Sequence, residues 1–289
     1  MFGIILAVTA TLLSEAGQTL SKKEVQSQRE TPAEMAFINI LFATAILLLI
    51  VFLVPANTFI GGLFGGFQFN LESLPYFLIR FGFELLVIYL FVQAITKATR
   101  ATFSFLRLIT IPLLLGVDIM LGYELSTLEI IGILVVVLTT SSLFFTRTLK
   151  TDGMWYVLSG SIAAVVTISL YKYNITNFNS VAGEQIVMLS MLLTTLFFVC
   201  LYRTRQNPLR HLARPRGLAQ ALLAGFTSVL VSVALSLAAA SIIMTIKRVS
   251  AIFWAILSGR TFFHEQHTGA KLAGLGILSV GILLLAGLS

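Results

Sequence analysis

A polar stripe crosses the otherwise apolar first segment of the chain. Its members recur at intervals of three or four residues: Thr11, Glu15, Gln18 and Lys22. On a helix this spacing places them on one face. An ionisable side chain inside a membrane is costly, and it is a functional candidate because it can bind a proton or a solute. We expect Glu15 and Gln18 to contribute to a binding site. A structural hydrogen bond to a neighbouring helix is the alternative.

A second pair of charges lies in the segment 75–95. Arg80 and Glu84 are four residues apart, so a helix would bring the two side chains together. A structural ion pair is one interpretation of this spacing. If the pair faces a cavity, its two charges could instead select a zwitterionic solute such as an amino acid.

Two arginines stand near the start of apolar segments, Arg107 in the segment 101–121 and Arg248 in the segment 242–263. We expect them near opposite membrane faces, as paired gates or as stations for an anionic group. Snorkelling to the lipid headgroups would explain a terminal arginine equally well. Asp118 follows Arg107 by eleven residues, three helical turns along the same face. Trp254 is a further candidate for the wall of a binding site.

Three other features bear on a cavity. Tyr171 is a candidate lining residue, and serines recur every fourth residue at Ser228, Ser232 and Ser236. Small hydroxyl side chains permit close helix packing and also offer hydrogen bonds to a solute. We expect the cavity to be built mainly from the segments 2–23, 75–95, 101–121, 154–173, 217–240 and 242–263.

Enzyme motifs do not account for these residues. The sequence His264-Glu265-Gln266-His267 places its histidines three apart, whereas a zinc-protease helix needs them four apart. A phosphate-binding loop and a nucleophile elbow are both absent from the sequence. We therefore expect no catalytic residues, no metal, no cofactor and no enzymatic activity. A lipid-modifying membrane enzyme and a passive channel are the alternatives to a carrier.

The composition identifies the elements that must position these side chains. Of the 289 residues, 57% are hydrophobic and 11% are charged, too little polar surface for a soluble globule. Segments of about 20 apolar residues can each cross a bilayer as a helix. Ten such segments are expected, at 2–23, 33–54, 75–95, 101–121, 127–146, 154–173, 180–202, 217–240, 242–263 and 268–288. The first lacks a basic start and a cleavage site, so we interpret it as a retained helix and not a signal peptide.

The ten segments divide into two copies of one module. The stretch Gln93–Phe145 reappears in degraded form at Leu235–Gly287, and Arg107 and Arg248, like Glu124 and Glu265, are 141 residues apart. A module with an odd number of spans must cross the bilayer in opposite senses in its two copies. We therefore expect an all-α membrane protein of ten transmembrane helices, arranged as two inverted five-helix repeats at residues 1–150 and 151–289.

This pattern resembles the drug/metabolite transporter superfamily, specifically its EamA-like ten-helix members. The resemblance rests on motifs in both halves and covers nearly the whole chain. The motifs are Ile111-Pro112, Leu121-Gly122-Tyr123-Glu124-Leu125-Ser126 and Ile131-Gly132, then Lys247-Arg248-Val249-Ser250, Phe263-His264-Glu265 and Gly274. It implies a secondary transporter that works by alternating access, with its substrate between the halves. The segment Leu13–Lys23 also resembles the opening helix of small multidrug-resistance proteins, which implies proton exchange at Glu15.

Taken together, the sequence predicts an exporter of a small polar or amphipathic metabolite, coupled to protons, in the inner (plasma) membrane. The expected partners are the metabolite, protons and the lipid bilayer, with no nucleic acid, and the protein is expected to be a monomer or weak homodimer. Alternate links between spans carry 14 lysines and arginines on one side and three on the other. The positive-inside rule then places both termini outside, whereas the family resemblance implies cytoplasmic termini, so the orientation is left open.

Overall fold

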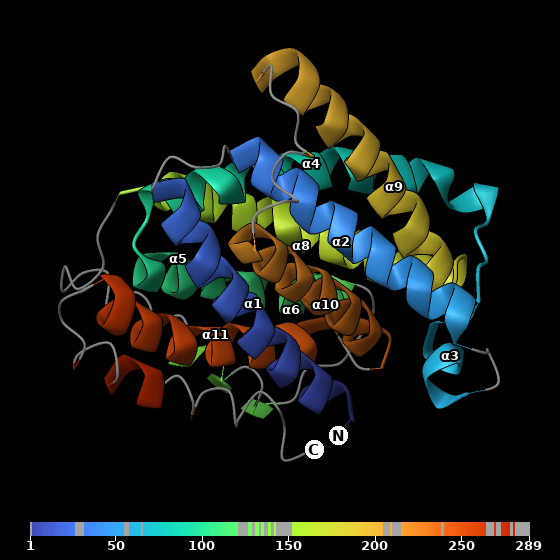
Figure 1. Ribbon diagram of the computed structural model, residues 1–289. Coiled ribbons are helices and arrows are strands. Elements are labelled where there is room, and N and C mark those ends of the chain that lie inside the picture. Colours follow the sequence, from blue (N-terminus) through green and yellow to red (C-terminus); the bar gives the residue numbers. More distant parts are fainter. Residues whose placement is uncertain are drawn as a thin grey trace.

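The chain is seen in a computed structural model, and every regular element in the part that it describes is a helix (Figure 1). The described residues are 2–26, 32–54, 58–64, 66–120, 152–204, 215–237 and 240–263, with isolated positions between 127 and 142, at 209 and between 269 and 280. The elements are α1 (Phe2–Gln26), α2 (Pro32–Leu53), α3 (Phe59–Phe64), η1 (Leu71–Ser73), α4 (Leu74–Lys97), α5 (Arg100–Leu106), η2 (Arg107–Ile109), α6 (Thr110–Met120), α8 (Met154–Asn177), α9 (Val181–Val199), the π-helical turn η3 (Cys200–Thr204), α10 (Pro215–Leu237) and α11 (Ala240–Phe263).

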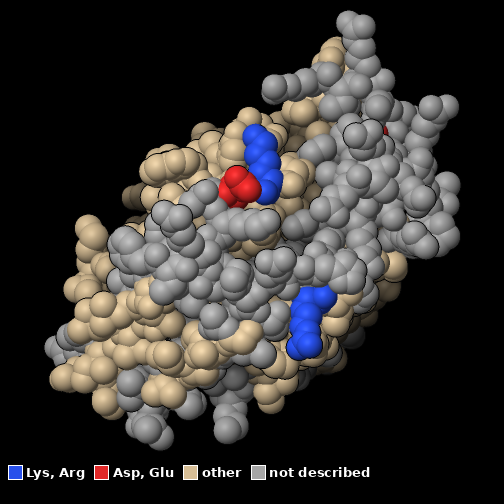
Figure 2. Space-filling view, turned by 90° about the vertical axis from the view of Figure 1, so that its left-hand side faces the viewer, with Lys and Arg blue, Asp and Glu red and all other residues tan. Residues whose placement is uncertain are grey.

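Within the described residues, five helices are long and apolar enough to cross a membrane. These candidate spans are Ala33–Leu53, Leu71–Lys97, Met154–Asn177, Val181–Tyr202 and Gly217–Leu237. Among the described residues on the face seen in Figure 2, charged side chains are few. The chain is therefore a multi-pass membrane protein by the length and composition of its helices.

The described helices fall on eight of the expected segments. The other two, at 127–146 and 268–288, lie largely outside the described residues, as do Glu124, Glu265 and His264. The number of ten spans and the inverted repeat therefore stay predictions.

The expected span at 101–121 is not one continuous helix. It begins where Thr99 accepts a hydrogen bond from the backbone of Thr102, and α5 ends after seven residues. A single 3₁₀ turn, η2, then leads into α6, and Pro112 falls in the first turn of α6. A proline there has no helical partner to lose, since the first backbone N–H groups of a helix are unpaired. Arg107 is the first residue of this 3₁₀ turn.

Helices from the two halves of the chain pack against each other. Helix α1 lies along α10 and α11, α4 lies along α8, and α2 lies between α9 and α10 (Figure 1). Buried apolar side chains from α1, α6, α8, α10 and α11 form one core cluster, which includes Ala7, Leu114, Val165, Ala234 and Ile243. The far end of α9 projects beyond the other helices in Figure 1.

Small residues allow some of these contacts. A Cβ on Gly225 of α10 would lie 2.8 Å from Ile46 Cδ1 and 2.9 Å from the backbone carbon of Phe42 on α2. Gly153, which precedes α8, has a positive φ of 73°, and a Cβ there would meet the backbone nitrogen of Ala98 at 2.8 Å. Glycine is therefore required both where α2 meets α10 and where the chain enters α8.

Candidate functional site

A cavity of about 210 Å³ lies among five helices from the two halves of the chain. Helix α4 contributes Arg80 and Glu84 to its wall, and α11 contributes Lys247. The remaining lining residues come from α8, α9 and α10: Thr167, Ile168, Tyr171, Gln185, Met188, Leu189, Leu192, Thr227, Ser228, Val231, Ser232 and Leu235. The wall thus combines apolar side chains with hydroxyl, amide and charged groups, as small-molecule sites do.

One end of the cavity is held by a buried ion pair between the halves. Arg80 on α4 donates to Glu184 on α9 across 2.5 Å, and both side chains are almost fully buried. Asn174 donates to Glu184 Oε1 at 3.0 Å and Asn179 donates to Glu184 Oε2 at 2.6 Å. The Arg80 guanidinium also lies 4.6 Å from the centre of the Tyr171 ring. Glu184 is therefore fully engaged, and the pair is neutral as a unit.

Loops anchor this ion pair from outside. Asn179, between α8 and α9, donates to Ser73 Oγ at 2.9 Å and accepts from the backbone N–H of Asn70 at 2.7 Å. Ser180 caps α9 by accepting from Gly183 N–H, and its hydroxyl donates to the carbonyl of Gly66 at 2.7 Å. The segment before α4 is thus joined to the start of α9, which fixes the position of Glu184.

The expected pairing of Arg80 with Glu84 is wrong. Among the described residues Arg80 forms its ion pair with Glu184, 104 residues away, and none with Glu84. Arg80 and Glu84 are about one turn apart on α4. However, α9 presents the Glu184 carboxylate, which Asn174 and Asn179 already orient. A buried carboxylate that other hydrogen bonds already orient pairs with Arg80 more favourably than a flexible carboxylate on the same helix. Glu84 instead lines the cavity.

A second group of charges lies where α1, η2, α6 and α11 meet. Glu15 and Arg107 act electrostatically on both Lys247 and Arg248. The Arg248 Nε donates to Thr110 Oγ1 at 3.2 Å, and the Thr110 hydroxyl in turn donates to the carbonyl of Arg107 at 2.7 Å. We call Glu15, Arg107, Lys247 and Arg248 the basic cluster.

The basic cluster overturns one expectation and refines another. Arg107 and Arg248 lie together and not near opposite membrane faces, since Thr110 bonds to both and the charge of Arg107 acts on Arg248. The Arg107 guanidinium lies 4.3 Å from the centre of the Phe91 ring and 4.9 Å from that of Phe103. Glu15 is buried as expected, but it faces this cluster and does not line the cavity.

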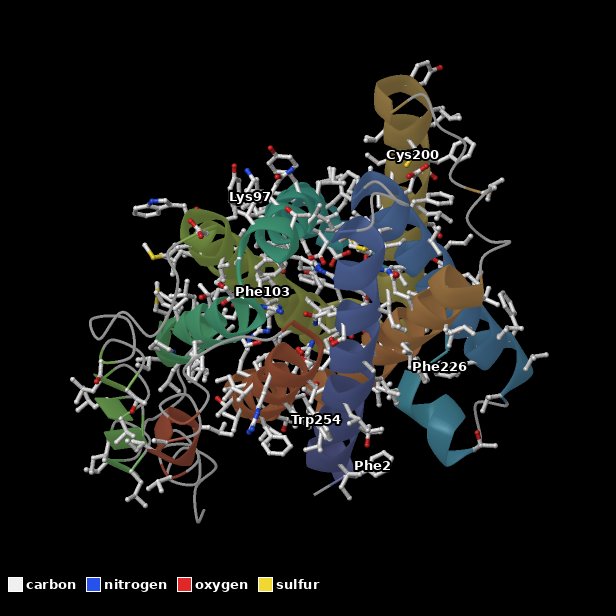
Figure 3. All side chains as sticks on the ribbon, turned by 60° about the vertical axis from the view of Figure 1, so that its left-hand side comes forward. Phe2, Lys97, Phe103, Cys200, Phe226 and Trp254 are labelled. Atoms are coloured by element: carbon white, nitrogen blue, oxygen red, sulfur yellow. The ribbon has the colours of Figure 1, made fainter. Side chains whose placement is uncertain are left out.

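The other candidates have different positions. Gln18 is half-buried and donates to Ser14 Oγ at 2.9 Å, one turn back on α1. Trp254 lies on α11 (Figure 3). It packs edge-on against Phe253 and is not among the residues that line the cavity. The side chain of Asp118 lies outside the described residues. Ser228 and Ser232 do line the cavity, as does Tyr171, whose hydroxyl donates to the carbonyl of Ser232 at 3.2 Å.

Sequence reasoning predicted α9 as a span, at 180–202, but missed its contribution to the cavity and the acid that it carries. The cavity takes four lining residues from α9, a span that was not expected to contribute, and none of its described lining residues from α1. Glu184 lies in the first turn of α9 after the capping Ser180. In the sequence, Glu184 looks like one of the acidic residues that commonly occur in the first turn of a helix, where they interact favourably with the helix dipole. The signal that could have found it is the adjacent Gln185, which places a carboxylate and an amide side by side near the start of a mostly apolar span.

Among the described residues, no group of three or more histidine, cysteine, aspartate or glutamate side chains could hold a metal ion. The arrangement can instead bind a small solute by charge and hydrogen bonds. No protein-family model and no curated protein matches the chain.

Proposed function

We propose that the protein is a secondary transporter that exports a small polar or amphipathic metabolite by alternating access, in exchange for protons. The observation that carries this proposal is the cavity of about 210 Å³ inside a bundle of apolar helices. Its wall carries charged and hydroxyl groups, among them Arg80, Glu84 and Lys247, and charged groups within a membrane bundle mark solute pathways. Both halves of the chain line it, which is the arrangement that alternating access requires.

The proposed architecture is ten helices in two inverted repeats, residues 1–150 and 151–289. The closeness of Arg107 and Arg248 supports it, because the two are equivalent positions in the repeat. Inverted repeats are related by an axis in the membrane plane, and equivalent residues meet only near that axis. Together with the motifs in both halves, this supports membership of the drug/metabolite transporter superfamily and a place in the inner (plasma) membrane.

Glu15 is the proposed proton carrier. It is buried on α1 and its charge acts on Lys247, which lines the cavity. Protonation of Glu15 would remove the negative charge from the basic cluster and so change how the cluster acts on a bound solute. Coupling between proton and solute follows from that shared electrostatic environment.

Counterflow in proteoliposomes tests the proposal. Vesicles are loaded with an unlabelled pool of amino acids, organic acids, nucleosides or sugars, and uptake of the labelled solute is followed against protein-free vesicles. Saturable, transient accumulation with one pool is the expected result. Ion conductance without counterflow would establish a channel, and chemical change in the vesicle lipids would establish an enzyme. Either of these results contradicts the proposal.

Proton coupling is tested with Glu15→Gln in the same vesicles. We expect counterflow to persist while uptake driven by an imposed pH gradient is lost, because exchange of solute for solute needs no net proton movement. The matched control is Glu72→Gln, which changes an exposed acid in η1. Gradient-driven uptake that survives in Glu15→Gln would remove Glu15 from the mechanism.

A further inference from the structure

Three of the four side chains in the basic cluster are basic: Arg107, Lys247 and Arg248. Of the described acids, Glu15 is the one whose charge acts on both Lys247 and Arg248. Arg80 belongs to a separate group, because Glu184 neutralises it. Buried basic groups in a membrane bundle are unfavourable unless an opposite charge accompanies them. The cluster is therefore complementary to an anion.

Arg248 has a hydrogen-bond donor to spare. Only 2% of the residue is exposed, its Nε is taken by Thr110, and its Nη2 has no hydrogen-bond partner among the described residues. A guanidinium group cannot lose its proton in a protein. Leaving such a charged donor buried and unsatisfied is costly, so this atom is suited to a ligand that supplies an acceptor.

Lys247 connects the cluster to the cavity. It precedes Arg248 on α11 and lines the cavity wall. Its ammonium group can donate three hydrogen bonds, and a lysine and an arginine together bind carboxylate or phosphate oxygens well. Hydroxyl groups of Thr227, Ser228 and Ser232 are on the same wall and can bind the uncharged part of a solute.

We infer that the transported solute is an anion whose carboxylate or phosphate group binds at Lys247 and Arg248, beside α11. The inference rests on the proposed function and names the substrate class of its cavity. Arg107 favours the anion by its charge, and Glu15 opposes it until a proton or a displacement of α1 weakens that opposition.

Binding to purified protein in detergent tests the inference without transport. Labelled lactate and labelled inorganic phosphate are compared with the neutral amide lactamide and the cation choline in equilibrium dialysis. We expect one of the two anions to bind, and neither lactamide nor choline. Lys247→Gln and Arg248→Gln should each weaken the binding of that anion about tenfold or more, because each removes a charged donor. Arg260→Gln, which changes an exposed arginine on the same helix, should bind as the wild type does.

Four results would overturn the inference. Binding of neither anion to the wild type is the first, and unchanged anion binding in both variants is the second. The third is anion binding that appears only after Asp118→Asn, because the cluster would then hold a carboxylate of the chain itself. If Arg248→Gln does not fold, Arg248→Lys, which retains the charge, is measured in its place. Phosphatidylglycerol that displaces phosphate completely would identify the ligand as a lipid headgroup and not a solute, which also overturns it.

The two proposals can fail separately. Counterflow of neutral or cationic solutes alone, without anion binding, would contradict the anion site and leave the transporter intact. Anion binding that Lys247→Gln weakens, in a protein that shows no counterflow, would support the site and contradict the proposed transport.

Discussion

Arg80 reaches from α4 to Glu184 on α9, and the two side chains are 6% and 0% exposed. Replacing Glu184 by Gln removes one charge and turns an amide donor towards Asn174 or Asn179, which already donate there. We expect Glu184→Gln to lower the free energy of unfolding by about 3–5 kcal/mol, the usual effect of breaking a buried ion pair. Thermal unfolding of the purified protein in detergent measures it.

Glu84→Gln is the matched control for that experiment. Glu84 is half-buried, lines the cavity and forms no ion pair with Arg80, so we expect a change within about 0.5 kcal/mol. Equal destabilisation by both substitutions would mean that Arg80 is paired with Glu84. A double change of Arg80 and Glu184 to Met should recover part of the stability, since no unpaired charge remains.

At this scale the sequence identified the right residues more often than the right partners. Arg80, Arg107 and Arg248 stand out because charges are rare in apolar segments, and all three prove to be in polar clusters. Their partners lie on helices more than 100 residues away in two cases, Glu184 for Arg80 and Thr110 for Arg248. Local spacing favours partners on the same helix and carries no information on which distant helix will pack there.

Helices α2 and α10 pack closely against each other at Gly225. A methyl group there would lie 2.9 Å from the backbone of Phe42, and backbone cannot move aside as the end of a side chain can. We expect Gly225→Ala to destabilise the protein by about 1–3 kcal/mol through overpacking. The same thermal unfolding experiment in detergent measures this change.

Gly82→Ala is the control within a long helix. A Cβ at Gly82 in α4 would meet no heavy atom within 4 Å, so alanine should be neutral or stabilising by up to about 1 kcal/mol, as helix propensity predicts. If Gly225→Ala were as harmless as Gly82→Ala, the close approach of α2 and α10 would be refuted.

Helix positions were predictable because about 20 consecutive apolar residues leave few alternatives in a membrane. The end of α5 at Leu106 and the 3₁₀ turn that follows it were not predictable from the sequence. The segment there, Ser104 to Thr110, contains no proline or glycine. Its break depends on tertiary contacts, among them the bond from Arg248 to Thr110, which no local propensity describes.

At the scale of the whole molecule, the cavity should be reachable by water. Ser228 is half-buried and lines the cavity, whereas Cys200, the single cysteine, is 0% exposed. We expect a small charged methanethiosulfonate reagent to label Ser228→Cys at least about tenfold faster than it labels the wild type, because thiol reactivity follows exposure. Mass spectrometry of the intact protein measures both rates.

Solute should slow that labelling if it occupies the cavity. Equal rates for Ser228→Cys and for the wild type would mean that the cavity is closed to water, or that Cys200 is more exposed than its packing against α2 and α10 suggests. Denaturing the protein first provides the reference, since both thiols should then react at similar rates.

The separation of Arg80 and Glu184 by 104 residues bears on how the protein is made. A ribosome adds roughly 5–20 residues per second, so roughly 5–20 s separate the synthesis of the two residues. Throughout that interval the nascent α4 carries an arginine without its carboxylate, at an insertion penalty of up to about 2.5–3.5 kcal/mol. The ion pair that joins α4 to α9 can therefore form only after α9 has been synthesised.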